Sequence, residues 1–187
     1  DAAHETLERQ LSRITRPSPD AVWYSGGEVL DLKRDAVVRA ELSDIVDRRF
    51  DEMPCIVNEL LVRKRLSRPM VNARKKTMLA ILERTGQPGL GYGVEATTPD
   101  ASVYRTVLER TGLYHTDEKG GRWLAYYQLS DPGLQSVWLE LTRFFNDPKE
   151  AKSPSELLSS LQEPPFGLRF GVIPLLLTAA LKAFGEA

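Results

Sequence analysis

The segment Arg63–Lys76 combines residue types that bind phosphate groups with a spacing that keeps them close together. Its sequence, RKRLSRPMVNARKK, contains no acidic residue and seven basic ones, which are Arg63, Lys64, Arg65, Arg68, Arg74, Lys75 and Lys76. We call these seven residues the basic strip. Several cations that converge on one strip can hold the phosphates of a nucleic acid. Arg74, Lys75 and Lys76 fan out over about 200° of a helix, so we expect at least one of them to be engaged within the protein.

The sequence carries no pattern typical of nucleotide or metal binding. It contains no GxxxxGK[ST], so it lacks a phosphate-cradling P-loop. The only histidines, His4 and His115, and the only cysteine, Cys55, do not stand at ligand spacing from one another. The glycine-rich Gly89–Gly93, GLGYG, follows no clear strand and opens no helix, so we interpret it as a flexible connector. We therefore expect neither a cofactor nor a metal.

No group of residues predicts catalysis. Cys55 follows Pro54 inside an apolar run, which favours a buried and inert thiol. Glu59 lies close to the basic strip, where a structural ion pair or cap is the expected role and a catalytic acid is the alternative. Trp123 follows Arg122 and is expected in or over the core, with stacking on a base as the alternative. We predict that this chain is not an enzyme.

Hydrophobic periodicity and turn residues predict a mainly helical chain with two small β-hairpins. Helix starts are marked by Ser67, by Thr98-Pro99-Asp100 and by a Ser153–Glu156 capping box. Glycine pairs in Ser25-Gly26-Gly27 and in Asp117–Gly121 supply tight turns. The predicted helices cover Leu7 to before Pro17, 36–50, 55–62, 68–85, 98–112, a segment from Asp131 onward, 153–161 and 172–184, and the predicted hairpins cover 22–32 and 113–129.

These elements suggest three structural regions. Residues 1–35 form an N-terminal helix and hairpin. Residues 36–130 have the element order of a winged helix, in which several short helices precede a hairpin wing. Residues 131–187 form a C-terminal helical subdomain, ending in a helical pair, that packs on this winged-helix-like module.

Composition indicates a globular protein without a membrane segment. Hydrophobic residues make up 42% and charged residues 27% of the 187 residues, with a net charge of -1. The longest uncharged apolar stretch, Phe170–Leu181, has twelve residues where a span needs about 20, so we expect a buried core helix there. A single cysteine favours a reducing, cytoplasmic setting. Asp1 is not a natural start, and we expect the chain to be part of a longer protein.

Several short motifs resemble a segment of very large bacterial P-loop proteins of phage-defence systems, the BrxC and PglY type of the BREX systems. The matching positions are Pro54, Asn58-Glu59-Leu60, Ser67, Ala73-Arg74-Lys75, Val103-Tyr104, Thr111-Gly112-Leu113, Pro165-Phe166-Gly167-Leu168 and Ile173-Pro174. The resemblance covers about residues 40–180. It implies a non-catalytic region of a P-loop ATPase whose nucleotide-binding domain lies outside this sequence, and no position here matches the ATPase residues of the family. A winged-helix module beside such a motor would contact DNA or a partner protein, by analogy of fold alone.

Two hypotheses for the basic strip follow, and a third gives it no binding role. It holds double-stranded DNA with weak sequence preference, helped by Lys119 and Arg122 on the second hairpin, since only Arg105 and Arg110 stand on the helix that would enter a groove. Alternatively, the strip docks on another domain or subunit of the parent assembly. The third possibility is a solvated basic surface. The net charge of -1 weighs against DNA, because dedicated DNA-binding domains are usually basic throughout.

Overall fold

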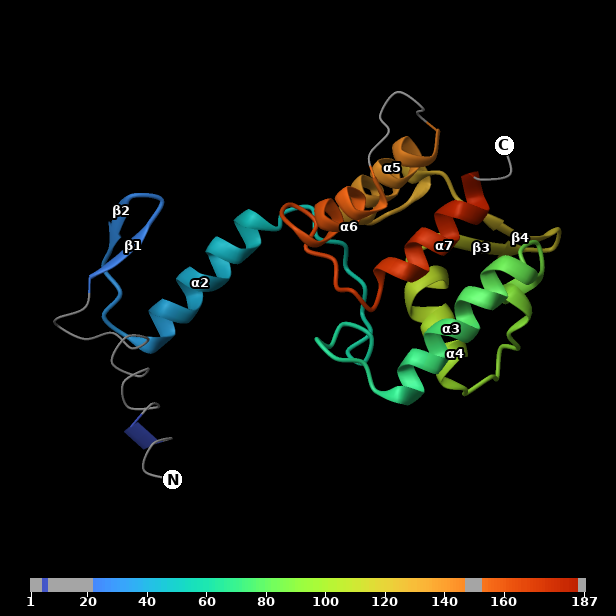
Figure 1. Ribbon diagram of the computed structural model, residues 1–187, viewed down its shortest axis with the longest axis horizontal. Helices are drawn as coiled ribbons and strands as arrows, with labels where there is room; N and C mark the ends of the chain where they lie inside the picture. The colour runs from blue at the N-terminus through green and yellow to red at the C-terminus, as the bar shows by residue number, and fades with distance from the viewer. Residues whose placement is uncertain (1–4, 7–21, 147–152, 185–187) are drawn as a thin grey trace. The chain divides into compact units, whose positions relative to one another are not determined.

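The computed structural model describes residues 5–6, 22–146 and 153–184 (Figure 1). It is mainly helical with two small antiparallel hairpins, as predicted. The chain divides into two compact units, Asp1–Arg49 and Phe50–Ala187, which we describe separately. The predicted boundaries after residues 35 and 130 stay predictions, and the predicted helix around Leu7, Leu11 and Ile14 lies outside the described residues.

In the first unit, a hairpin precedes one long helix. Strand β1 (Trp23–Ser25) pairs antiparallel with β2 (Glu28–Leu30), and the pairing places Tyr24 opposite Val29. The turn requires glycine, since Gly26 and Gly27 have φ angles of 60° and 88°. Helix α2 (Asp35–Arg49) begins with an acid and ends with two arginines, an arrangement that complements the helix dipole.

The second unit begins with a turn at a position where a helix was predicted. The expected helix over 55–62 is wrong, because Asn58 accepts the Leu61 N–H through its side chain (3.0 Å) as well as through its carbonyl oxygen (3.0 Å). An asparagine side chain that bonds nearby backbone favours turns over helix. The expectation of a buried thiol is also wrong: Cys55 is exposed, and its N–H donates to Asp131 (3.1 Å).

Helix α3 (Arg68–Glu83) organises the core of the second unit. Ser67 takes the extended conformation of an N-cap residue and Pro69 lies in the first turn, although the Ser67 side chain makes no capping hydrogen bond. One face of α3 packs against α4 (Pro99–Tyr104) and α7 (Ile173–Phe184). The buried residues of this face are Met70, Ala73, Thr77, Ala80 and Ile81.

The second hairpin lies next to the C-terminal end of α3. Helix α4 continues into a π turn over Arg105–Glu109, so the predicted helix at 98–112 is present with a change of winding. The following strands, β3 (Tyr114–Asp117) and β4 (Gly120–Trp123), pair antiparallel. The Gly121 N–H donates to the carbonyl of Gly86, three residues after α3 (3.0 Å).

Aromatic rings join the hairpin to α4. Tyr92 stacks on Tyr104 with centroids 5.4 Å apart, Tyr104 meets Tyr114 edge-on at 6.3 Å, and Tyr114 meets Trp123 at 4.8 Å. Tyr104 is only 1% exposed, and its burial raises the pKa of its hydroxyl to about 12. The neutral phenol is therefore the form that the fold accommodates.

The raised pKa of Tyr104 predicts a loss of stability at alkaline pH. An unfolded tyrosine titrates near pH 10, so above that pH the unfolded chain releases a proton that the folded chain retains up to about pH 12. Stability is thus complete below about pH 10 and should fall by about 2–3 kcal/mol as the pH rises to 12. Denaturant melts of Tyr104→Phe should show a shallower decline, because burial also raises the pKa values of Tyr92 and Tyr114, and Tyr24→Phe at an exposed position is the matched control. An equally steep decline in Tyr104→Phe would contradict the assignment to Tyr104.

Three helices complete the second unit. They are α5 (Pro132–Asn146), α6 (Pro154–Gln162) and α7. The predicted capping box is confirmed, since Glu156 N–H donates to Ser153 Oγ (3.2 Å) and Ser153 N–H to the Glu156 carboxylate (2.6 Å). The predicted core helix is also confirmed, because Ile173, Leu175 and Leu176 of α7 are fully buried. No helix within the described ranges combines the length and apolarity needed to cross a membrane.

A glycine allows the chain to enter α7. A Cβ atom at Gly171 would overlap the carbonyl oxygen of Leu61, so only glycine permits this close approach of two backbones. The turn at Asn58–Leu61 and the start of α7 are thereby held together, although they lie more than a hundred residues apart in the sequence.

Candidate cationic binding surface

Six residues of the basic strip are exposed and close in sequence to the start of α3. Arg63, Lys64 and Arg65 lie in bends before the helix, and Arg68 is its first residue. Lys75 and Lys76 lie further along α3 and fall within about 100° of Arg68 around its axis, opposite the buried face. We call Arg63, Lys64, Arg65, Arg68, Lys75 and Lys76 the cationic surface.

The side chains of the cationic surface are exposed to solvent. Within the part of the chain that the structure describes, no ion pair or hydrogen bond engages any of these six side chains. Among the described residues, no carboxylate neutralises these positive charges and no contact within the fold uses them. They are therefore available to an anionic partner.

Arg74 differs from its neighbours because it is engaged within the second unit. Its guanidinium donates to the Phe170 carbonyl (3.3 Å) and lies 5.9 Å from the centroid of the Phe170 ring. Partial burial lowers the pKa of Arg74, and its Nε atom is buried without a partner. Arg74 thus fastens the segment before α7 to α3 and is a structural residue.

The cations of the second hairpin do not join the cationic surface. Lys119 is exposed in the β3–β4 turn, and the Arg122 guanidinium lies 3.7 Å from the Asp117 carboxylate. The hairpin is bonded to Gly86, so it lies roughly 25 Å along the helix axis from Arg68, given a rise of 1.5 Å per residue. The structure therefore brings the loop and helix cations together and leaves Lys119 and Arg122 at the opposite end of α3.

The helix before the hairpin is a core element. Ala101, Val103 and Tyr104 of α4 are buried. Arg105 donates to the carbonyls of Gly93 (3.1 Å) and Val94 (2.7 Å) and so holds the preceding loop. Of the two arginines expected on a groove-entering helix, this leaves Arg110 exposed.

The sequence did not predict two exposed apolar residues that lie on the same side of α3 as Lys75. Leu79 is 52% exposed and Leu82 is 43% exposed, although both belong to α3. They follow Lys75 at spacings of four and seven residues, which places all three on one side of the helix. Comparing this spacing with that of the buried positions of α3 could have identified Leu79 and Leu82 as exposed residues.

The remaining candidate residues have structural roles or are scattered. Leu90 is fully buried with a left-handed φ of 52°, between two glycines that also have positive φ, so the glycine-rich segment is an anchored turn and its interpretation as a flexible connector is wrong. Trp123 packs against Tyr114 and is partly buried, which leaves little of its ring for stacking. Glu59 and His115 are exposed. No cluster of His, Cys, Asp and Glu in the described ranges could hold a metal ion.

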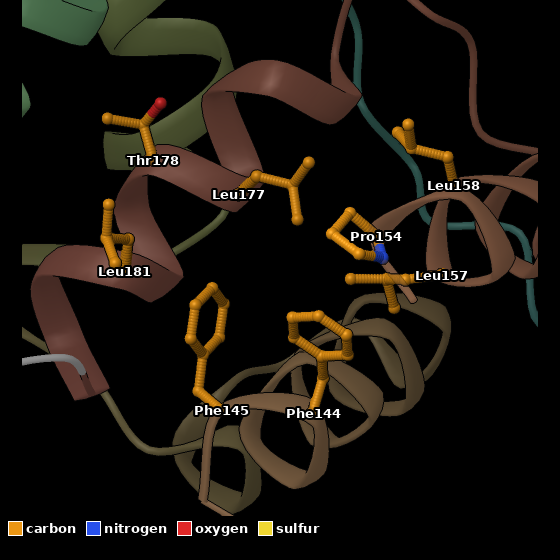
Figure 2. Close-up of a pocket in the computed structure, with 8 residues that line it drawn as sticks. All are labelled: Phe144, Phe145, Pro154, Leu157, Leu158, Leu177, Thr178 and Leu181. Carbon is orange, nitrogen blue, oxygen red and sulfur yellow. The ribbon is translucent and has the colours of Figure 1, made fainter. Parts of the chain in front are cut away.

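An apolar cavity lies between α5, α6 and α7 (Figure 2). Its volume is about 320 Å³, and its lining consists of Phe144, Phe145, Pro154, Leu157, Leu158, Leu177, Thr178 and Leu181. The one polar side chain, Thr178, donates its hydroxyl to the Pro174 carbonyl (2.7 Å). This lining offers no group that would orient a polar substrate.

No protein-family model, no curated protein and no solved structure matches the chain. The family resemblance therefore depends on the short motifs alone. The function has to be inferred from the surface itself.

Proposed function

We propose that this chain is a non-catalytic binding module that holds the phosphates of double-stranded DNA on its cationic surface. The observation that carries the proposal is a set of six exposed cations at the start and on the outer face of α3, none of which has a partner among the described residues. A duplex presents a regular row of phosphates, and each Lys or Arg that meets one releases a condensed counterion.

The proposed contacts favour weak sequence preference. Arg63, Lys64 and Arg65 stand on a loop, from which flexible side chains reach the phosphate backbone more readily than base edges. The helix before the second hairpin is occupied by core packing, which supports backbone binding over groove recognition. The order of α3, α4 and the hairpin supports a winged-helix-like module, and α5 to α7 would form the C-terminal subdomain packed on it.

The resemblance to BrxC and PglY proteins extends this proposal to the parent protein. In it, the module would serve a cytoplasmic P-loop ATPase of a phage-defence system, whose motor domain lies outside this sequence. A duplex-binding module would keep such a motor on its DNA.

A second candidate function is docking on another protein. Leu79 and Leu82 favour it, because half-exposed leucines beside lysines fit the apolar stripe of an acidic helix better than a phosphate backbone. On this alternative the partner is another domain or subunit of the parent assembly.

The salt dependence of duplex binding tests the main proposal. With about four to six phosphate contacts, the slope of log affinity against log salt should be about -4 to -5. Mobility-shift titrations with two duplexes of unrelated sequence, from about 50 mM to about 200 mM salt, should give that slope and similar affinities for both. If high micromolar protein shifts neither duplex at the lowest salt, the DNA proposal fails and the protein-docking function takes its place.

A further inference from the structure

The described part of the first unit contains almost no core. Between residues 22 and 49, Val38 is the one buried side chain. A two-stranded hairpin is marginally stable by itself, and so is a single helix of this length. The described residues of β1, β2 and α2 thus leave apolar side chains open to a further surface, since Tyr24, Val29, Leu42 and Val46 are each half exposed or more.

Helix α2 presents an apolar seam for such a surface. Asp35, Val38, Leu42, Ile45 and Arg49 follow one another at spacings of three, four, three and four residues, which is the repeat of a coiled-coil seam. Leu42 is 51% exposed, and Val46 beside the seam is 50% exposed. The seam is apolar in its middle, begins with an acid and ends with a base.

The charges at the two ends of this seam are complementary to each other. No ion pair or hydrogen bond to another residue of the described ranges engages the side chain of Asp35 or of Arg49. Arg48, by contrast, lies 3.4 Å from Glu41 and donates to the Asp44 carbonyl (3.1 Å). Arg39, Asp44 and Asp47 of α2 are likewise without an ion pair among the described residues, so Asp35 and Arg49 are distinguished by their place at the two ends of the seam.

We propose that two copies of the chain associate through α2, antiparallel, with Leu42 of each copy at the two-fold axis. This arrangement places Asp35 of one copy opposite Arg49 of the other at both ends, with the half-exposed Leu42 and Val46 between them. A parallel pair would instead oppose like charges at each end. A two-fold interface must be self-complementary, and the seam of α2 fulfils that condition only in the antiparallel direction.

The proposed dimer is small and depends on concentration. A helix of 15 residues is roughly 22 Å long, so the contact is smaller than a standard stable interface. We expect reversible association in the micromolar range, observable by sedimentation velocity over a range of protein concentrations. The proposal is independent of DNA binding, which concerns the second unit.

Charge exchange tests both the dimer and its direction. Asp35→Arg or Arg49→Asp alone should weaken dimerisation about tenfold or more, because each opposes like charges at both ends. The double variant Asp35→Arg/Arg49→Asp should restore it, since both cross-pairs are re-formed. Asp47→Arg makes the same charge change on the opposite side of α2 and should leave dimerisation unaltered.

Two results would overturn the proposal. One is a monomer at all concentrations for the unaltered chain. The other is a double variant that dimerises no better than the single variants, with the helical circular dichroism of all proteins unchanged. Leu42→Asp, which buries two carboxylates at the two-fold axis, should abolish the dimer outright.

Discussion

Replacing Arg68, Lys75 and Lys76 by glutamate is expected to abolish duplex binding and to leave the melting temperature nearly unchanged. The three side chains are exposed and have no partner in the described part of the chain, so the folded state loses no contact. An acid at position 68 even complements the N-terminal end of α3. Binding is lost because three attractions to phosphate become repulsions, a change measured by mobility shift at about 50 mM salt.

A matched triple variant distinguishes position from net charge. Arg110, Lys119 and Arg122 are also exposed, and their replacement by glutamate lowers the net charge of the chain by the same amount. Because Lys119 and Arg122 lie at the other end of α3, and Arg110 belongs neither to α3 nor to the loop before it, we expect a much smaller loss of affinity. Equal losses for the two triple variants would show that net charge, and not the cationic surface, governs binding.

Trp138→Ala is expected to cost about 3–5 kcal/mol of folding stability, the largest loss we expect from a single substitution. Trp138 is fully buried in α5, its ring centroid lies 5.3 Å from that of Phe184, and its indole N–H donates to the Leu124 carbonyl (3.0 Å). Alanine would remove the ring contact and the hydrogen bond and leave a cavity. Denaturant unfolding measures the loss.

Trp138→Phe separates these two contributions. It keeps an aromatic ring beside Phe184 and leaves the Leu124 carbonyl without its donor, so we expect a cost of about 1–3 kcal/mol. A cost for Trp138→Ala below about 1 kcal/mol would mean that α5 is not packed as described.

Local signals in the sequence predicted the helices and turns well. Thr98-Pro99-Asp100 and the capping box at Ser153 mark helix starts that the structure confirms. Both hairpins form at their glycine pairs. Each of these elements depends on backbone hydrogen bonds and φ angles within a few residues, which is why a single sequence is sufficient to predict them.

The incorrect predictions concern residues whose conformation depends on contacts with residues distant in the sequence. The segment 55–62 is a turn, in which Asn58 bonds the nearby backbone and Cys55 is bonded to Asp131, 76 residues away. Arg74 is indistinguishable from Lys75 in sequence, and its separate role depends on Phe170, 96 residues away. The cations of the candidate surface could be predicted from the local run of basic residues in the sequence. Their separation from Lys119 and Arg122 follows from the place of the second hairpin, which no local pattern specifies.

The packing of α3 against α7 has a consequence for synthesis of the protein. These helices are the first and the last of the second unit, and about 90 residues separate the end of one from the start of the other. At ribosomal speed those residues take roughly 5–20 s to make, and throughout that time the part of α3 that packs on α7 lacks its partner helix. The part of α3 that packs on α7 is thus uncovered in the nascent chain until α7 has been synthesised. A chaperone that binds nascent chains can therefore contact this part of α3 before α7 packs on it.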